Sequence, residues 1–181
     1  ELRRGVLASP DPAGALAGWS SRDHIAIAIP DLTRSLPLRE ALTALSERIP
    51  NRTIIVGLGL HRPMTPTELA PLSPWNPRQH DPDDCVSTMT INGIHGGIHR
   101  SIAEADWTLS IGVCELHQYA GLSGGHKGVS VGCGSRETIH GLHQRDFLIR
   151  PGITVGHLDK NPFRSTVDLL GRAAGCHLAL N

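Results

Sequence analysis

The residues of this chain that could do chemistry concentrate around a glycine-rich segment, Gly121 to Gly125. His117 precedes this segment, Lys127 follows it, and His143 comes a short distance later. Glycines let backbone amides approach an anionic ligand closely. The lysine adds a charge or a nucleophilic amine, and the two imidazoles add proton transfer or metal ligation. Packing alone rarely requires all of these together, so the pattern indicates an enzyme, or the larger part of one.

The composition limits the classes of partner. At 181 residues the chain suits one well-buried domain. Its 17 basic and 17 acidic side chains cancel and aromatic residues make up 3%, so we expect no nucleic-acid partner. No apolar run approaches the ~20 residues of a membrane span, so we expect no membrane partner either. The four cysteines form no Cys-x-x-Cys pair. This predicts reduced thiols in a cytoplasmic protein.

Short β-branched runs alternate with helical patterns along the chain. This alternation is typical of a parallel α/β sheet. We predict an α/β fold, a Rossmann-like three-layer parallel sheet with helices on both faces. The predicted strands cover residues 24–29, 53–58, 107–113 and 176–180, with 85–91 extended. The predicted helices cover residues 38–49, 98–105, 136–146 and 162–174, and a further helix begins at 66 behind the cap residue Thr65.

The expected extent of the domain depends on where the alternation of predicted strands and helices stops. The sequence ends on the predicted strand at 176–180, and a terminal strand usually needs a partner or a continuation. We therefore expect residues 1–181 to be a fragment or a minimal domain.

Polar side chains follow three of the predicted strands. Asp31 and Arg34 follow the first, His61 follows the second and His117 follows the third. In open α/β sheets, ligands bind in the crevice beyond the carboxyl ends of the strands. These groups should therefore meet at one edge of the sheet, where the glycine-rich segment and Lys127 continue from the third strand.

Each candidate also has a plain structural interpretation. His61 and His117 suit a two-base racemase or epimerase, because each imidazole can act as acid or base near neutral pH, but either could simply orient a turn. Arg34 could hold a carboxylate or phosphate with its planar fork, or form an ion pair with Asp31. The loop before Lys127 resembles a phosphate cradle but lacks the spacing of a nucleoside-triphosphate loop, so a glycine turn with a solvated lysine remains an alternative.

Two further histidine motifs suggest metals. His143 follows His140 by three residues on a predicted helix, and its nearness to Lys127 favours a metal-binding role for His143. His80-Asp81, followed by two more aspartates, could be a second metal site or a polar loop.

Several of these motifs together resemble the nickel-pincer lactate racemase family, whose members interconvert the enantiomers of 2-hydroxy acids. The similarity runs from about Val6 to Asn181. It rests on Asp31-Leu-Thr-Arg34, Gly59-Leu-His-Arg-Pro-Met-Thr-Pro-Thr-Glu68, His80-Asp81, Ala103-Glu-Ala-Asp106, Glu115-Leu-His-Gln-Tyr-Ala-Gly-Leu-Ser-Gly-Gly-His-Lys127, Ser135-Arg-Glu-Thr-Ile139 with His143, and Asn161-Pro162.

The resemblance implies a role for each motif. Lys127 matches the lysine that links covalently to the cofactor, a pyridinium-3,5-bisthiocarboxylic acid mononucleotide that carries nickel. His143 matches the protein ligand that completes nickel coordination beside two sulfurs and a ring carbon. His61 and His117 match the paired acid/base histidines. The implied contacts to cofactor and substrate are Asp31, Thr33 and Arg34 after the first strand, and Ser123, Gly124 and Gly125 in the glycine-rich segment.

The implied reaction is racemisation or epimerisation of a small 2-hydroxy acid. One histidine removes the hydroxyl proton while the Cα hydride passes to the cofactor, and the hydride returns to the other face of the 2-keto acid. The other histidine then serves as the proton partner. The resemblance also implies cofactor-biosynthesis enzymes as partners, and a homo-oligomer is left open.

The chain departs from the family pattern at several positions. Ser35, Leu116 and Val131 stand where proline is usual, and His126 stands where arginine or a small residue is commoner. The resemblance implies that residues 1–181 are the family's cofactor-binding N-terminal domain without its carboxyl-terminal domain, so we expect that the fragment alone can be inactive. Two alternatives remain: a zinc-dependent lyase or hydrolase that uses His61, His117 and His143, and a non-catalytic domain that has lost the cofactor.

Overall fold

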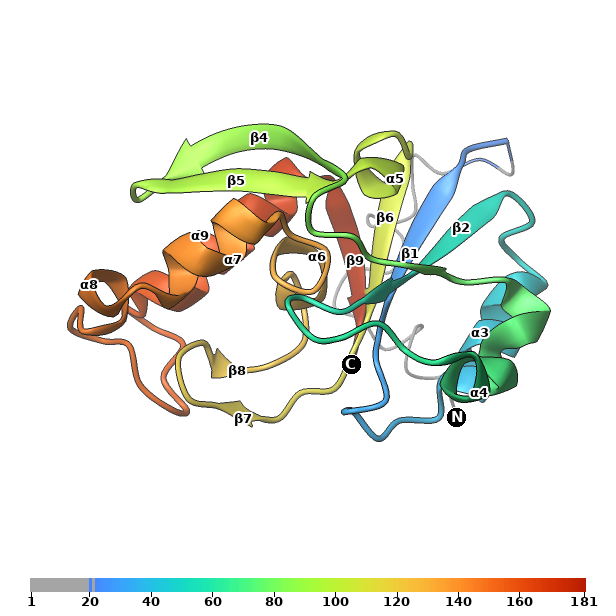
Figure 1. The fold of residues 1–181 in the computed structure, drawn as a ribbon, viewed down its shortest axis with the longest axis horizontal. Coiled ribbons are helices and arrows are strands. Elements are labelled where there is room, and N and C mark those ends of the chain that lie inside the picture. Colours follow the sequence, from blue (N-terminus) through green and yellow to red (C-terminus); the bar gives the residue numbers. More distant parts are fainter. Residues whose placement is uncertain (1–19, 21) are drawn as a thin grey trace.

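A five-stranded parallel sheet forms the centre of the molecule (Figure 1). The computed structural model describes residue 20 and residues 22–181. The strand order is β3-β2-β1-β6-β9, and every neighbouring pair runs parallel. These strands are β1 (Ile25–Pro30), β2 (Arg52–Gly57), β3 (Arg78–Gln79), β6 (Trp107–Ile111) and β9 (Cys176–Leu180).

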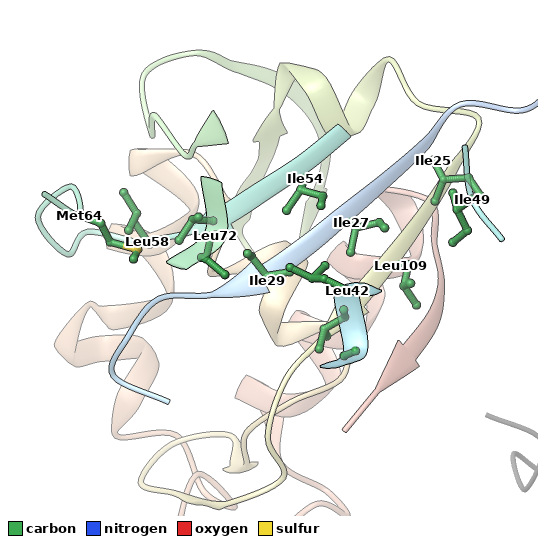
Figure 2. Packing of buried hydrophobic residues seen from close by; sticks show 13 residues of the cluster. Ile25, Ile27, Ile29, Leu42, Ile49, Ile54, Leu58, Met64, Leu72 and Leu109 are labelled. Atoms are coloured by element: carbon green, nitrogen blue, oxygen red, sulfur yellow. The ribbon is translucent and has the colours of Figure 1, made fainter. Parts of the chain in front are cut away.

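The alternation of side chains along β1 explains the layers. Ile25, Ile27 and Ile29 are buried on one face of the sheet, where they pack with Leu42 of helix α3 (Leu38–Ser46), as Figure 2 shows. Ala26 and Ala28 are buried on the other face, against side chains that include those of α5 (Arg100–Ala103) and α6 (Lys127–Ser130). Successive strand residues point to opposite faces, so both faces need a cover. The predicted three-layer α/β fold is therefore confirmed.

The predicted helix start at Thr65 is confirmed, but the helix is short. The Thr65 hydroxyl accepts a hydrogen bond from the Glu68 amide, and the Glu68 carboxylate accepts one from the Thr65 amide. Helix α4 (Pro66–Leu69) then passes into a 3₁₀ segment, η1 (Ala70–Trp75). Pro71 and Pro74 lack the amide hydrogen that a continuing α-helix needs.

The helix predicted for residues 98–105 is present but shorter, as α5 (Arg100–Ala103). Residues Ile94–His99 form strand β5, which pairs antiparallel with β4 (Cys85–Ile91), and only α5 beyond it is helical. The turn between the strands is Asn92-Gly93, and both residues have positive φ, 54° and 82°. Asn-Gly with positive φ at both positions is the preferred two-residue hairpin turn, so the sequence carried a signal for this hairpin.

A second group of elements packs beside the sheet. The β4–β5 hairpin lies against α7 (Arg136–His143) and α9 (Pro162–Ala173) (Figure 1). Phe163 is fully buried in the apolar cluster that these elements share. Helix α7 ends at His143, earlier than predicted, because the backbone of Gln144 is extended, and α8 (Arg145–Leu148) follows. The chain between β6 and α6 forms a short antiparallel pair, β7 (Leu116–His117) and β8 (Gly121–Leu122).

Two simpler expectations can also be compared with the structure. All four cysteines are free thiols. Among the residues that the structure describes, no helix combines the length and the apolar character needed to cross a bilayer.

Candidate active site

A cavity of about 400 Å³ opens where β1, β2 and β6 reach their carboxyl ends. The residues after these strands, the glycine-rich segment and the last turn of α7 all contribute to its wall. Of the predicted site residues, the structure brings the following to this wall: Asp31, Thr33, Arg34, His61, His117, Ser123, Gly124, Lys127 and His143. Gly125 is the exception and does not line the cavity. The convergence expected from the strand order is therefore present.

His61 is held by the carboxylate of Asp31. Its Nδ1 lies 2.7 Å from Asp31 Oδ2, and the hydroxyl and amide of Thr33 both donate to Asp31 Oδ1. Burial raises the pKa of Asp31, but the hydrogen bonds from Thr33 and His61 outweigh it and hold this pKa below its usual value. Asp31 is therefore a carboxylate that accepts the Nδ1 hydrogen of His61. This leaves a lone pair on His61 Nε2, which can take a proton.

His117 is held by the backbone of its own turn. Its Nδ1 accepts hydrogen bonds from the amides of Tyr119 at 3.2 Å and Ala120 at 3.0 Å. Burial, together with the positive charges of Lys127 and Arg34, lowers the pKa of His117 to about 4. His117 is therefore a neutral imidazole at neutral pH.

His143 presents one nitrogen for coordination. Its Nδ1 donates to the carbonyl of Ile139, one turn earlier in α7, at 2.7 Å. The rings of Tyr119 and Phe163 pack around it, with centroid distances of 5.9 Å and 5.7 Å. A backbone partner on Nδ1 fixes the tautomer in which Nε2 carries the lone pair that a metal needs.

Lys127 begins helix α6 beside the glycine-rich segment. Burial, together with the positive charges of Arg34 and Arg164, lowers its pKa from 10.5 to about 8. Near neutral pH this raises the neutral fraction of the amine well above that of an ordinary lysine. A lysine in this state is a usable nucleophile.

Arg34 has a different partner from the one that its motif suggested. Its guanidinium lies 2.5 Å from the carboxylate of Glu115, whereas Asp31 is bonded to His61. The Arg34 and Glu115 side chains are 34% and 46% exposed, so water screens this ion pair. Arg34 therefore already holds a carboxylate at the cavity, and a ligand carboxylate can compete for the same guanidinium.

The glycine-rich segment is anchored by contacts that the sequence did not reveal. The Gly125 amide donates to the side-chain oxygen of Asn181 at 3.0 Å, and Gly124 and Gly125 have positive φ. The hydroxyl of Ser123 donates to the Val113 carbonyl and accepts from the Glu115 amide, so this hydroxyl holds the loop together.

Arg164 was also missed. It makes two hydrogen bonds to Asp168, at 2.9 Å and 2.6 Å, and a third to the Leu122 carbonyl at 3.3 Å. Arg164 and Asp168 are four residues apart on α9, the spacing at which opposite charges pair on a helix, so this pair was predictable.

Two metal sites suggested by the sequence can be compared with the geometry: a zinc site at His61, His117 and His143, and a site at His80-Asp81. Across residues 22–181, no three His, Cys, Asp or Glu side chains are grouped so that they could hold a metal ion. His61, His117 and His143 therefore do not form the three-ligand set that the zinc alternative requires. The same holds for His80-Asp81, where His80 is a buried histidine whose pKa burial lowers to about 4.

These features define a parallel α/β domain whose carboxyl-edge cavity presents three histidines and a lysine with a lowered pKa. The sequence pattern of the lactate racemase N-terminal domain matches residues 4–156, and the chain belongs to this family. Lactate racemase from Lactiplantibacillus plantarum is 29% identical over 176 residues, and that from Thermoanaerobacterium thermosaccharolyticum is 27% identical.

Solved structures give the same result for the fold. The lactate racemase apoprotein from T. thermosaccharolyticum superposes with a TM-score of 0.85 at 25% identity and covers 97% of this chain. A protein from Thermotoga maritima superposes with a TM-score of 0.71 at 19% identity and covers 95% of this chain. The chain covers 42% and 41% of the two lactate racemase sequences and 46% of each solved chain, so it spans less than half the length of these relatives.

Proposed function

We propose that this chain is the cofactor-binding domain of a 2-hydroxyacid racemase or epimerase, an isomerase. The observation that carries the proposal is that Lys127, His61, His117 and His143 surround a single cavity in a chain of the lactate racemase N-terminal domain family. Catalysis belongs to the whole protein, because the relatives are more than twice as long as this chain.

The nickel-pincer nucleotide is the cofactor that the residues of this cavity fit. Lys127 supplies an amine whose lowered pKa suits covalent attachment, and His143 supplies one free ring nitrogen to complete a nickel site. The glycine-rich segment from Ser123 to Gly125 is the expected place for the phosphate. When bound, this group would supply the acceptor for the substrate hydride.

The protein's own residues would bind and deprotonate the substrate. Arg34 is placed to bind the carboxylate of a 2-hydroxy acid, in competition with Glu115. His61 and His117 would face the substrate hydroxyl, and His61 has a carboxylate partner that would stabilise it after it takes a proton. The enzymes that make the cofactor are the expected protein partners, and a cytoplasmic location fits the free thiols.

The proposal is tested by the intact mass and metal content of the chain after co-expression with cofactor-making enzymes. We expect an adduct of nucleotide size on Lys127 and about one nickel per chain, because coordination uses His143 as a single protein ligand. Lys127→Met should abolish the adduct, and Lys160→Met, at an exposed lysine, should retain it. An unmodified chain that holds zinc would favour the zinc lyase or hydrolase. An unmodified chain without metal would mean either that this part of the protein cannot load the cofactor or that it is a non-catalytic domain, and the same measurement on a full-length protein separates the two.

A further inference from the structure

We infer that Asn161 positions His117: its side-chain amide fixes the peptide group that hydrogen-bonds to the imidazole. The role of Asn161 in the reaction rests on the proposed function, because His117 is one of the two acid/base histidines of that proposal. Asn161 does not line the cavity, so it acts through His117 and is a positioning residue.

The orientation of the Asn161 amide follows from its partners. Its Oδ1 accepts a hydrogen bond from the Arg164 amide at 3.1 Å, which caps helix α9. Its Nδ2 donates to two backbone carbonyls, those of Tyr119 at 2.8 Å and His157 at 2.9 Å. Backbone carbonyls only accept and backbone amides only donate, so the reversed orientation would lose all three bonds. The residue is 1% exposed, and its oxygen and both amide hydrogens are used, so the side chain is held in one position.

One of these bonds reaches His117 through a single peptide group. The carbonyl of Tyr119 and the amide of Ala120 belong to the same planar peptide unit. Asn161 donates to the oxygen of this unit at 2.8 Å, and the N–H of the unit donates to His117 Nδ1 at 3.0 Å. A donor on the oxygen polarises the peptide group and strengthens the hydrogen bond that its N–H makes. Asn161 therefore sets the direction and the strength of a bond that orients the His117 ring.

The short strands beside His117 need this outside support. Strands β7 and β8 have two residues each, and a hairpin of this size is not stable alone. Gly121 in β8 has a positive φ of 74°, and a side chain there would overlap the backbone of His157. The Gly156 amide donates to the Gly121 carbonyl at 3.0 Å. The segment that leads to Asn161 thus lies directly against β8, and the Asn161 amide joins this segment, the start of α9 and the β7–β8 turn.

The consequence for the reaction is a defined position of the second ring nitrogen. The backbone amides occupy His117 Nδ1, so Nε2 is the nitrogen available to the substrate in the cavity. A general acid or base must lie within hydrogen-bond reach of the proton that it transfers. Rotation of the Tyr119–Ala120 peptide would tilt the ring and move Nε2 out of reach. Loss of the Asn161 donor should therefore slow the chemical step more than it weakens substrate binding.

The hydrogen-bond relay is tested in the purified chain without cofactor. Asn161→Ser and Asn161→Asp each keep an oxygen that can cap α9 but remove the amide donors, and either variant is sufficient if the other does not fold. Long-range ¹H–¹⁵N spectra of ¹⁵N-histidine-labelled protein at pH 7 report the tautomers of His117, with its signal assigned from His117→Asn. We expect one tautomer in the wild-type chain and a mixture of two in the Asn161 variants, with the ratio reduced about tenfold, the effect of one weakened hydrogen bond.

A matched variant separates this effect from a general loss of stability. Val167 is fully buried in α9 and makes no contact with the relay, so Val167→Ala should lower the urea midpoint and leave the single His117 tautomer unchanged. An unchanged tautomer ratio in the Asn161 variants, or an equal change in Val167→Ala, would overturn the inference. This result does not depend on whether the protein loads cofactor or racemises a substrate.

The same variants of the full-length, cofactor-loaded protein test the role in catalysis. We expect Asn161→Ser to lower kcat about 10- to 100-fold, the cost of a displaced acid/base group, and to change KM by less than about twofold. Val167→Ala should leave both constants unchanged. A higher KM at unchanged kcat would overturn the positioning role, whereas failure of the wild-type protein to racemise would contradict the proposed function instead.

Discussion

Within the part of the chain that the structure describes, two hollows of nearly equal volume differ in the protonation states that they favour. One is the cavity of about 400 Å³ at the carboxyl edge of the sheet. The other, of about 410 Å³, lies between the β4–β5 hairpin and the start of α7. Lys127 lines the first and Cys85 lines the second, and the reactivity of each depends on its protonation state. Volume alone therefore does not distinguish a site from a surface depression.

Burial acts on both nucleophiles in the same way but with opposite chemical results. Removal from water favours the neutral form of any ionisable group. For Lys127 the neutral form is the nucleophilic amine, and its pKa falls to about 8. For Cys85 the neutral form is the unreactive thiol, and burial, with the nearby charge of Asp84, raises its pKa to about 12. The same desolvation thus raises the reactivity of Lys127 in the first hollow and lowers the reactivity of Cys85 in the second.

The largest expected effect is the low reactivity of Cys85. A pKa raised from 9.0 to about 12 reduces the thiolate fraction by about a thousandfold near neutral pH, and the thiolate is the reactive form. We expect iodoacetamide at pH 8 to modify the exposed Cys114 long before Cys85, as measured by peptide mass spectrometry over time. Equal rates at the two cysteines would mean that the second hollow stabilises the thiolate of Cys85. Burial would then not have opposite effects on the reactivity of Lys127 and Cys85.

The next effect is the high reactivity of Lys127. A pKa lowered from 10.5 to about 8 raises the neutral amine fraction at pH 7 by about 300-fold. A small acylating reagent at limiting concentration should therefore modify Lys127 preferentially, with half-maximal rate near pH 8, and the exposed Lys160 provides the internal control. If the rate at Lys127 continues to rise steeply above pH 9, the amine is not activated.

The positions of these groups were partly predictable from the sequence. The carboxyl ends of parallel strands share one edge, so residues that directly follow strands had to meet, and Asp31, His61 and His117 do line one cavity. Short apolar runs located β1, β2, β6 and β9, because the strands of a parallel sheet are covered on both faces and are therefore rich in apolar residues.

The contacts within the cavity could not be predicted in this way. Arg34 and Glu115 are 81 positions apart, and Gly125 and Asn181 are 56 apart. Such pairs depend on how the loops after the strands pack against one another. The periodicity of the sequence does not predict that packing. Residues 85–91 were expected to be extended and form β4, but β5 was missed, because the prediction did not use the hairpin signal of the Asn-Gly turn between the two strands.

A smaller effect should appear in stability at acid pH. The pKa of His117 is about 4 in the folded state and about 6.5 in an unfolded chain. Between these values the unfolded state binds a proton that the folded state excludes, so the free energy of unfolding falls as the pH falls from 6.5 to 4. His117→Asn should reduce this decline in urea titrations at pH 7 and pH 5, and His140→Asn, at the exposed histidine of the second hollow, should leave it unchanged. An identical decline in both variants would show that His117 is not held neutral by the fold.

The smallest effect is expected at the charged pair of the second hollow. Arg136 donates two hydrogen bonds to Asp83, at 2.9 Å and 2.8 Å, but the side chains are 50% and 66% exposed. Water screens such a pair, and the entropy lost in holding two side chains together offsets most of the attraction. Arg136→Gln should leave the urea midpoint and the labelling rate of Lys127 unchanged, whereas Arg34→Gln should slow that labelling, because Arg34 helps to lower the pKa of Lys127. An equal change in both variants would mean that charge acts across the whole domain, and the first cavity would not be electrostatically separate from the second.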